Sequence, residues 1–383
     1  MQPIDLQLLS QPWVFCGDGT TFPGVGTTTR FLDPNKDFAH LPTRKWLKFS
    51  FFVQGGFDGV NVFDREKSAL TDVAVRREFG EPAQGAEFGP TVRAYRKALD
   101  VMAEKADVDI QLLAIPGLRH SSITDYAIEA VESRFDALLL MDVEEKDQFN
   151  SFITGSSQLP SVSYTADRVA DRNLDTSFAA AYYPDVVVQD PTTLTNVVAP
   201  PTVAVLGAFA LNDTVAYPWF APAGFTRGAL ARVLETQVKL NRTNLDDLYE
   251  VDVNPLTSFA DSPGVVVFGQ KTMLAAQSAL DRVNVRRLLI EIRRRVRRIA
   301  NTFIFEPNRE ETLSRFSAAV NPVLQQIQAQ RGVSRFKVQI DTTTTTQADV
   351  ENNTVRGKIY VQPTRSLEFV SLDFVVTNQG ATV

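Results

Sequence analysis

Cysteine and histidine are scarce in this chain of 383 residues: Cys16 is the single cysteine, and His40 and His120 are the two histidines. One cysteine excludes an internal disulfide and a metal site built from several cysteines. Two histidines restrict general-base chemistry near neutral pH. The chain also lacks an apolar run near the roughly 20 residues of a membrane-spanning helix, and it lacks a secretory signal. We therefore expect no metal, no other cofactor and no membrane insertion, in a protein made in a cytoplasm.

The common sequence motifs of enzymes are absent too. Neither a G-x-S-x-G nucleophile turn nor an H-E-x-x-H zinc motif occurs. Residues 264–272 (GVVVFGQKT) approach a phosphate-binding loop, but Gln270 separates the second glycine from Lys271, and the valines before it favour a strand. His120 precedes two serines, for which helix capping by Ser121 or Ser122 is a simpler interpretation than a nucleophile beside its base. A nucleotide-binding or hydrolytic α/β enzyme that uses residues 264–272 is kept as the alternative, and no catalytic residue is predicted.

The most strongly patterned stretch runs from Asp281 to Asn308. Its apolar residues recur at intervals of three and four, which predicts an amphipathic α-helix; they are Val285, Leu288, Leu289, Ile292, Val296, Ile299, Ala300 and Phe303. The opposite face is rich in arginine, namely Arg286, Arg287, Arg293, Arg294, Arg295, Arg297 and Arg298. Between Asp281 and Ala300 eight arginines meet two acidic residues, whereas the whole chain has a net charge of −6. This asymmetry predicts a directional contact with an acidic partner.

Helical and strand patterns alternate ahead of this stretch, which is typical of a parallel sheet covered by helices. Strand patterns lie at residues 108–115, 137–141, 186–188, 203–206 and 264–268, and helical spacing lies at 92–102 and 123–131. Residues 150–185 have the composition of a long connection. We predict an α/β fold with a central, mainly parallel sheet and flanking helices, plus a C-terminal α+β domain and extended terminal arms. Its parts are a segment at 1–44, a central domain at 45–275 and an assembly domain at 276–383.

The C-terminal domain is predicted to continue with a helix at 310–330 and strands at 336–341 and 357–362, joined by an exposed run of threonines. In the last segment, 367–383, apolar Val370, Leu372, Phe374 and Val376 alternate with polar residues. This alternation predicts a strand with one buried face.

Several short motifs, in this order, are similar to those of one protein family. They are LAIPG at 113–117, the strand at 137–142, AAYYP at 180–184, WFAPAGFTRG at 219–228, GVVVFG at 264–269, VNVRRLLI at 283–290, FEPN at 305–308, and the strands at 336–341, 357–362 and 368–374. Together they resemble the contractile tail sheath proteins of bacteriophages and related injection particles. Residues 1–30 carry only Phe22–Val25 of the family's N-terminal arm motif.

The resemblance implies a structural subunit without an active site. Such subunits assemble as hexameric rings stacked helically around an inner tail tube, and they contract to drive the tube through the cell envelope of the host. The implied partners are further copies of the chain, the tail tube protein, and baseplate and terminator proteins. The implied location is the tail sheath of a virion, assembled in the host cytoplasm.

Two groups of residues receive roles from this resemblance. A terminal strand that pairs with a neighbour's sheet holds subunits together while they move, which fits 367–383 and the residues Phe369, Val370, Leu372, Phe374 and Val376. The arginine face is expected to meet the tube, with Arg293, Arg294, Arg297 and Arg298 as the contacts. Two other interpretations of that face remain open. One is an ordinary solvated helix surface, and the other is a nucleic-acid contact, which the acidic chain and the lack of aromatics on the helix disfavour.

Overall fold

The computed structural model describes residues 70–80, 89–153, 158–259, 264–341, 344–366 and 368. The chain divides into two compact units at Gly59/Val60, and all described residues belong to the second. The predicted segment 1–44 and the strand residues 369–376 lie outside the described residues.

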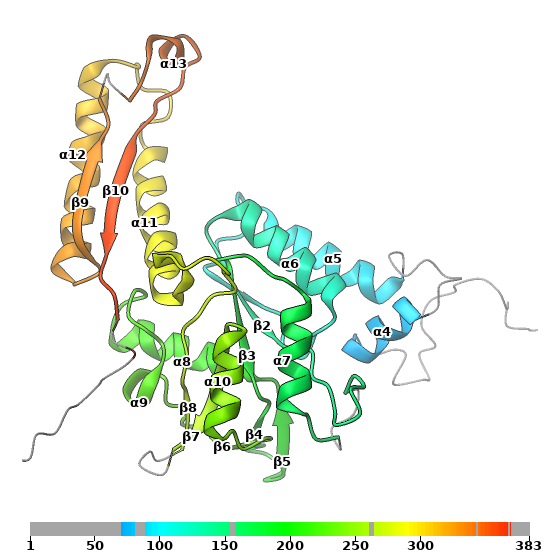
Figure 1. The fold of residues 1–383 in the computed structure, drawn as a ribbon. Coiled ribbons are helices and arrows are strands. Elements are labelled where there is room, and N and C mark those ends of the chain that lie inside the picture. Colours follow the sequence, from blue (N-terminus) through cyan, green and yellow to red (C-terminus); the bar gives the residue numbers. More distant parts are fainter. Residues whose placement is uncertain are drawn as a thin grey trace, which may run out of the picture. The chain divides into compact units, whose positions relative to one another are not determined.

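A five-stranded sheet lies at the centre of this unit, in the order β1-β2-β3-β7-β8 (Figure 1). The first four strands are parallel, and β8 pairs antiparallel with β7. Its strands are β1 Leu112–Ala114, β2 Leu138–Asp142, β3 Ala179–Tyr183, β7 Val253–Ser258 and β8 Val265–Val267. The predicted α/β fold with a mainly parallel sheet is confirmed.

Helices cover both faces of the sheet because alternate residues of β2 and β3 point into two separate cores. Leu139 and Ala181 pack with one set of helices, and Leu140 and Tyr182 pack with another. The first set is α4 Asp72–Gly80, α5 Pro90–Ala103, α6 Ser121–Arg134, α7 Val162–Asp171 and α10 Arg242–Glu250. The second set is α8 Pro201–Val215 and the start of α11 Val283–Asn301. This double cover explains why the central strands are apolar throughout.

Two predicted segments of the central domain were wrong. Residues 203–206, predicted as a strand, lie in α8, where Pro201 occupies the first turn and needs no backbone hydrogen-bond donor there. The connection predicted at 150–185 contains α7 and the buried central strand β3. A smaller antiparallel sheet, in the order β5-β4-β6, lies beside them; its strands are β4 Val186–Gln189, β5 Asn196–Ala199 and β6 Val233–Thr236.

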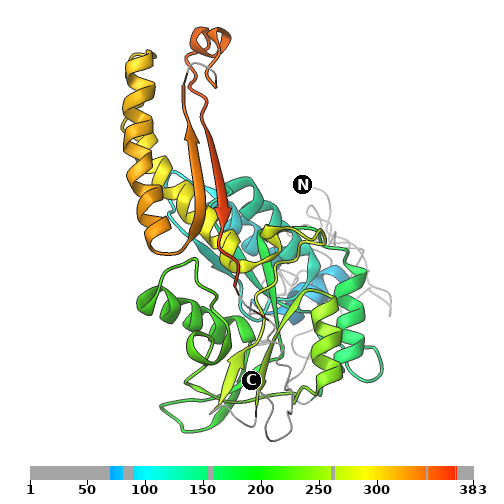
Figure 2. The ribbon, with the colours of Figure 1, turned by 60° about the vertical axis from the view of Figure 1, so that its left-hand side comes forward.

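The C-terminal module comprises α11, α12 Glu310–Ala329, β9 Val333–Gln339, α13 Gln347–Glu351 and β10 Lys358–Pro363. β9 and β10 form an antiparallel hairpin, and Figure 2 shows it running alongside the two long helices. The helix and the two strands predicted here are confirmed within a few residues. The threonine run is not wholly exposed, because Thr345 is buried and donates to the carbonyl of Arg356.

Trp219 joins the C-terminal module to the central part of the chain. The segment between α8 and the short α9 (Gly224–Arg227) places its indole in the core of the module, against Leu288 and Ile327. The indole nitrogen donates to the carbonyl of Gln330 at 3.1 Å. A Cβ on neighbouring Gly332 would lie 2.7 Å from a methyl of Ile327 and 3.1 Å from the indole nitrogen. Only glycine therefore lets the α12–β9 turn come this close to the tryptophan.

Candidate functional site

The helix α11 forms where the sequence pattern predicts it. Contacts with the rest of the chain fix its start and pack its C-terminal half against α12. The Val283 amide donates to the carbonyl of Gln270 at 2.8 Å, which fixes the start of the helix. Its buried apolar residues are Val283, Val285, Leu288, Ile290 and Ile292. Toward its C-terminal end the helix packs against α12 through partly buried Val296 and Ile299. The arginines on the remaining surface are therefore held on a rigid, well-packed element.

Arg286 and Arg287 do not lie on the charged outer face, so their predicted placement was wrong. Arg287 is buried: its guanidinium lies 4.9 Å from the ring centroid of Phe209 and pairs with Asp213 at 2.6 Å. Arg286 lies 3.7 Å from the ring centroid of Phe178, and burial, assisted by the nearby charge of Arg293, lowers its pKa to about 10. The helix α8, which supplies Phe209 and Asp213, covers this side of α11.

Three of the four arginines expected to contact the tube face acidic residues of their own chain. Arg294 pairs with Asp109, and Arg298 lies 3.9 Å from the same carboxylate. Arg297 lies 3.6 Å from Asp136. The side chains of Arg297 and Arg298 nevertheless remain 51% and 73% exposed, so both can still meet another surface.

Arg293, the fourth, is exposed and its guanidinium lies over the ring of Phe135, with 4.9 Å between the guanidinium carbon and the ring centroid. Phe135 is itself half exposed. The Arg293–Phe135 pair therefore places an exposed aromatic ring beside the cationic surface of α11.

The segment that leads toward the predicted terminal strand is held at the base of α11. Glu368 forms an ion pair with Arg282 at 2.7 Å and accepts a hydrogen bond from the side-chain amide of Gln270 at 2.9 Å. Ser366 accepts from the Asn284 amide at 3.1 Å. Residues 364–366 and Glu368, which we call the strap, are thus held in a fixed position at the base of α11. The candidate strand residues Phe369, Val370, Leu372, Phe374 and Val376 follow the strap and lie outside the described residues.

Residues 264–272 do not form a phosphate cradle. Val265–Val267 are the strand β8, buried and paired with β7. The Lys271 ammonium donates to the Tyr249 carbonyl at 2.6 Å and pairs with Asp252 at 2.8 Å. A lysine held in this way stabilises the loop between α10 and β7. Its ammonium does not point toward a loop of backbone N–H groups that could bind a phosphate.

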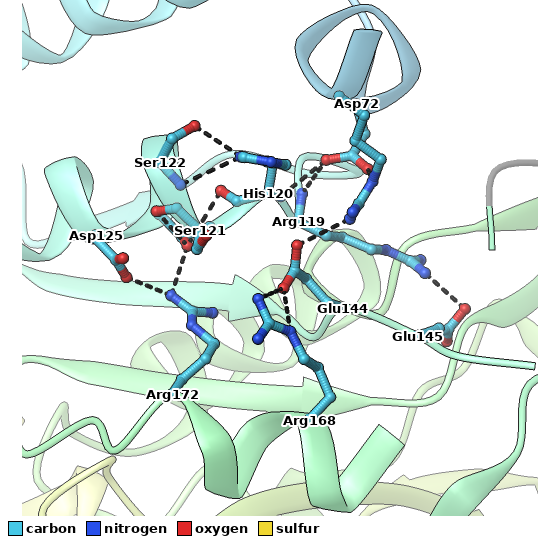
Figure 3. A network of polar contacts seen from close by, with 12 residues as sticks. Asp72, Arg119, His120, Ser121, Ser122, Asp125, Glu144, Glu145, Arg168 and Arg172 are labelled. Atoms are coloured by element: carbon cyan, nitrogen blue, oxygen red, sulfur yellow. Dashed lines mark hydrogen bonds and ion pairs between the residues drawn. The ribbon is translucent and has the colours of Figure 1, made fainter. Parts of the chain in front are cut away.

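A cluster of buried ion pairs occupies the carboxyl edge of the parallel sheet (Figure 3). Arg119 pairs with Glu145 at 2.6 Å and with Asp185 at 2.5 Å. Glu144 pairs with Arg76 at 3.0 Å and with Arg168 at 2.7 Å. In α/β proteins this edge commonly binds ligands. Here these charges, which we call the ion-pair cluster, are directed at one another and tie α4, α7 and the strand ends together.

The carboxylates of the ion-pair cluster are strongly desolvated. Burial raises the pKa of Glu145 to about 7, although the attraction of Arg119 acts in the opposite direction. Burial also raises the pKa of Asp142, which accepts hydrogen bonds from the amides of Gly117 and Thr202. Through Thr202 the end of β2 holds the start of α8. Sequence reasoning missed the ion-pair cluster because its members are scattered along the chain, from Asp72, which pairs with Arg76 at 2.6 Å, to Asp185.

His120 caps α6 rather than acting as a base, which corrects the predicted capping by Ser121 or Ser122. Its Nδ1 accepts from the Ser122 amide at 3.3 Å and lies 2.8 Å from the Ser122 hydroxyl. The imidazole stacks on Phe79 at 4.7 Å between ring centroids. Burial and the nearby charge of Arg76 lower its pKa. The histidine is therefore part of the packing between α4 and α6.

The fold is a three-layer α/β domain joined to a module of helices and a β-hairpin. The carboxyl edge of its sheet, where α/β enzymes bind ligands, is filled by the protein's own ion pairs. The phage tail sheath protein central domain matches residues 90–273, and the phage tail sheath C-terminal domain matches residues 275–377. These two matches are consecutive and cover most of the chain. The chain belongs to the phage tail sheath family.

Curated relatives are similar over part of their length. The tail sheath protein of Vibrio phage KVP40 is 37% identical over 177 residues, which are 46% of this chain and 26% of that protein. The tail sheath protein of Enterobacteria phage T4 is 28% identical over 294 residues, 74% of this chain and 44% of that protein. The chain thus spans less than half the length of these relatives.

Solved structures of contractile injection systems share the fold. A chain of the anti-feeding prophage baseplate gives a TM-score of 0.59 at 21% identity, covering 74% of this chain and 72% of that one. A chain of the sheath complex of an extracellular contractile injection system in its contracted state gives 0.57 at 23% identity, with 72% and 74% covered. The comparisons give the alternative of a nucleotide-binding or hydrolytic enzyme no support. No helix among the described residues is long and apolar enough to cross a bilayer.

Proposed function

We propose that the chain is a structural subunit of a contractile tail sheath. It polymerises as hexameric rings, stacked helically around an inner tail tube, and contracts to drive that tube through the cell envelope of a host. The observation that carries this proposal is the consecutive match to the central and C-terminal sheath domains, on a fold shared with chains of contracted sheaths. Baseplate, terminator and tube proteins are the proposed partners, and the proposed location is the tail of a virion assembled in the host cytoplasm. The proposed domain boundaries remain 1–44, 45–275 and 276–383.

The described contacts support a mechanical role without a nucleotide. The energy for contraction is stored when the subunits assemble in a metastable extended state, and the contracted state buries more surface between them. Such a subunit must move as a rigid body. The ion-pair cluster and the Trp219 contact provide this rigidity, because they fix the helices and the C-terminal module to one sheet.

The segment 367–383 is proposed to donate a strand to a neighbouring chain, through residues 369–383, which follow the strap. We predict that deleting them leaves a folded chain that no longer forms tubes. The strap and its Glu368 contacts remain in this variant, and the five described strands of the central sheet all precede the deletion. The measurement is electron microscopy of tubes at high protein concentration, with far-UV circular dichroism as the test of folding.

The alternation of the strand supplies a matched control for this deletion. Changing Val370 and Leu372 to Ser should stop tube formation, because it removes the apolar face that a neighbour's sheet would cover. Changing Ser371 and Asp373 to Ala, on the opposite face, should leave tubes intact. Normal tubes from the deletion variant, or equal behaviour of the two faces, would contradict strand donation.

The arginine face is proposed to dock on the tail tube through Arg293, Arg294, Arg297 and Arg298. Single exposed ion pairs contribute only about 0–1 kcal/mol each, but their repetition around each ring holds the extended sheath in register while allowing release. We predict that Arg297→Glu with Arg298→Glu reduces assembly of extended sheath on its tube, more strongly at low salt, where screening is least.

Tube-free polymers provide the control for this second prediction. The Arg297→Glu, Arg298→Glu variant should form polysheath in the absence of tube as efficiently as the unmodified chain. A matched variant, Arg232→Glu with Arg242→Glu, changes two exposed arginines away from α11 and should assemble normally on the tube. If both variants lose tube assembly equally, or if the first also loses polysheath, the tube-docking role is wrong.

A further inference from the structure

The loop between α11 and α12 carries the most exposed apolar side chains of the C-terminal module. Residues 302–309, which we call the tip, include Phe305, which is fully exposed, and Ile304, which is 57% exposed. Phe305 has a φ of +73°, in the left-handed region that an aromatic residue rarely adopts. The tip is nevertheless held in place: the Asn308 amide donates to the carbonyl of Thr354 at 3.2 Å, next to α13. An aromatic ring kept exposed on a strained, anchored turn suggests an interaction surface.

A cavity of 840 Å³ lies at the opposite end of the same module, and we call it the basal pocket. Aromatic residues Phe220, Tyr249 and Phe268 form part of its wall, together with Trp219. Phe268 is 44% exposed, so the pocket opens to solvent on this side. The strap residues Thr364–Ser366 and the α12–β9 turn complete the rim. This volume lies within the usual range of pockets that enclose most of a bound group.

Two unsatisfied hydrogen-bond acceptors belong to the wall of the basal pocket. Gln270 and Asn284 are both more than nine-tenths buried, and both line the cavity. Their amide nitrogens hold the strap, whereas their amide oxygens have no partner among the described residues. Buried acceptors of this kind are normally paired.

The tip and the basal pocket are complementary in charge. Residues 302–311 carry three glutamates, Glu306, Glu310 and Glu311, against the single arginine Arg309. Glu306 also lies 3.8 Å from Arg315 of its own chain, but its side chain remains 41% exposed. The rim of the pocket carries Arg331 and Arg365, which are both exposed. An acidic tip is therefore attracted to a basic rim, and this attraction fixes the orientation of an apolar anchor.

The tip of one chain cannot reach the basal pocket of that same chain. The tip follows the C-terminal end of α11, whereas Asn284 at the other end of that helix lines the pocket. The 19 residues of α11 separate the two by about 28 Å. A contact between two different surfaces on two copies of a chain is heterologous, and it produces rings or open helical polymers.

We propose that the Ile304–Phe305 tip of one chain inserts into the basal pocket of a second copy of the same chain. This inference rests on the self-assembly proposed above and adds to it a specific contact between subunits. Phe305 is the anchor that enters the aromatic cavity, and the acidic residues of the tip meet Arg331 and Arg365 at the rim.

Disulfide trapping tests this contact directly. In a Cys16→Ser background, chains with Glu306→Cys are mixed with chains with Arg365→Cys, assembled into tubes, oxidised gently, and resolved on a non-reducing gel. Both substitutions leave Phe305 and the aromatic wall of the cavity unchanged. We expect a cross-linked dimer in yields at least about tenfold above those of the control mixture of Glu306→Cys with Arg232→Cys, which replaces an exposed arginine away from the pocket. Tubes that give no such enrichment overturn the proposed contact and leave the sheath function standing, whereas a mixture that forms neither tubes nor cross-links contradicts both.

The anchor itself is tested by Phe305→Gly. Glycine accepts the positive φ without strain, so this variant should fold and melt at the same temperature as the unmodified chain or higher. Its critical concentration for tube formation should rise by about tenfold or more, the size of effect expected when an aromatic anchor is removed. Tube formation at the unmodified concentration overturns the proposal. Impaired tubes without enriched cross-links mean that the tip contacts a different surface, which also overturns it.

Discussion

Trp219→Ala should lower the free energy of unfolding by about 3–5 kcal/mol, the range measured when large buried aromatic residues are truncated. The indole is 5% exposed and belongs to the same core as Leu288 and Ile327 of the C-terminal module. Truncation also leaves the carbonyl of Gln330 without its donor. Because Trp219 comes from the central part of the chain, its loss should loosen the attachment of the whole module. Urea denaturation followed by circular dichroism measures the loss of stability, and limited proteolysis between β8 and α11 measures the loosening.

Two control substitutions, one at Trp219 and one at Tyr217, test whether the loss of stability comes from the buried indole. Trp219→Phe retains an aromatic ring and should lose roughly half as much free energy of unfolding as Trp219→Ala. Tyr217→Ala removes the ring that stacks on Trp219 at 5.0 Å but is 38% exposed, so it should cost less than either. A Trp219→Ala chain that unfolds at the same urea concentration as the unmodified chain would show that the module is held by other contacts.

Arg119→Met should be similarly damaging, and its effect should depend on pH. The substitution removes the cation between Glu145 and Asp185 while keeping most of the side-chain volume. Breaking a buried ion pair by removing one partner typically costs about 3–5 kcal/mol, because the other charge stays buried without compensation. The ends of β2 and β3 and the segment before α6 would all lose their common contact.

The direction of the pH effect follows from the pKa of Glu145. In the folded chain this pKa is raised from the ordinary 4.5 to about 7, and removing Arg119 raises it further. A carboxyl with a raised folded-state pKa adds stability below its unfolded pKa, and that contribution is lost as pH rises through the folded pKa. The destabilisation of Arg119→Met relative to the unmodified chain should therefore be larger at pH 8 than at pH 5. Adding Glu145→Gln, which removes one of the unpaired charges, should recover part of the stability at pH 8. A destabilisation of equal size at both pH values would contradict the role given to the ionisation of Glu145.

The sequence predicted those elements whose own residues determine them. The helix α11 follows from its three-and-four spacing, and β2 follows from a continuous apolar run between turns. β3 was missed because Ala179–Ala181 have a low intrinsic preference for strands; burial between two helical layers makes small residues suitable there. α8 was mistaken for a strand because its prolines were interpreted as breaks, although Pro201 starts a helix whose next residue, Thr202, is held by Asp142.

Side-chain roles that depend on tertiary contacts could not be predicted in the same way. Arg287 occupies a position in α11 that the helical pattern assigns to the charged face, yet α8 covers it and supplies Asp213 and Phe209. The ion-pair cluster joins residues more than a hundred positions apart, between Asp72 and Asp185. The pairing of Arg294 with Asp109 depends in the same way on the docking of the C-terminal module. Periodicity identifies which residues share a face, but only the fold determines what that face meets.

Cryo-electron microscopy of the purified chain at high concentration tests the central claim most directly. A contractile sheath subunit should form hollow tubes of stacked hexameric rings without added nucleotide, and a helical reconstruction should place α11 and its exposed arginines on the inner wall. Discrete particles that never polymerise at any concentration or ionic strength would contradict the sheath function. Tubes with α11 on the outer wall would retain self-assembly and exclude the proposed contact between the arginine face and the tail tube.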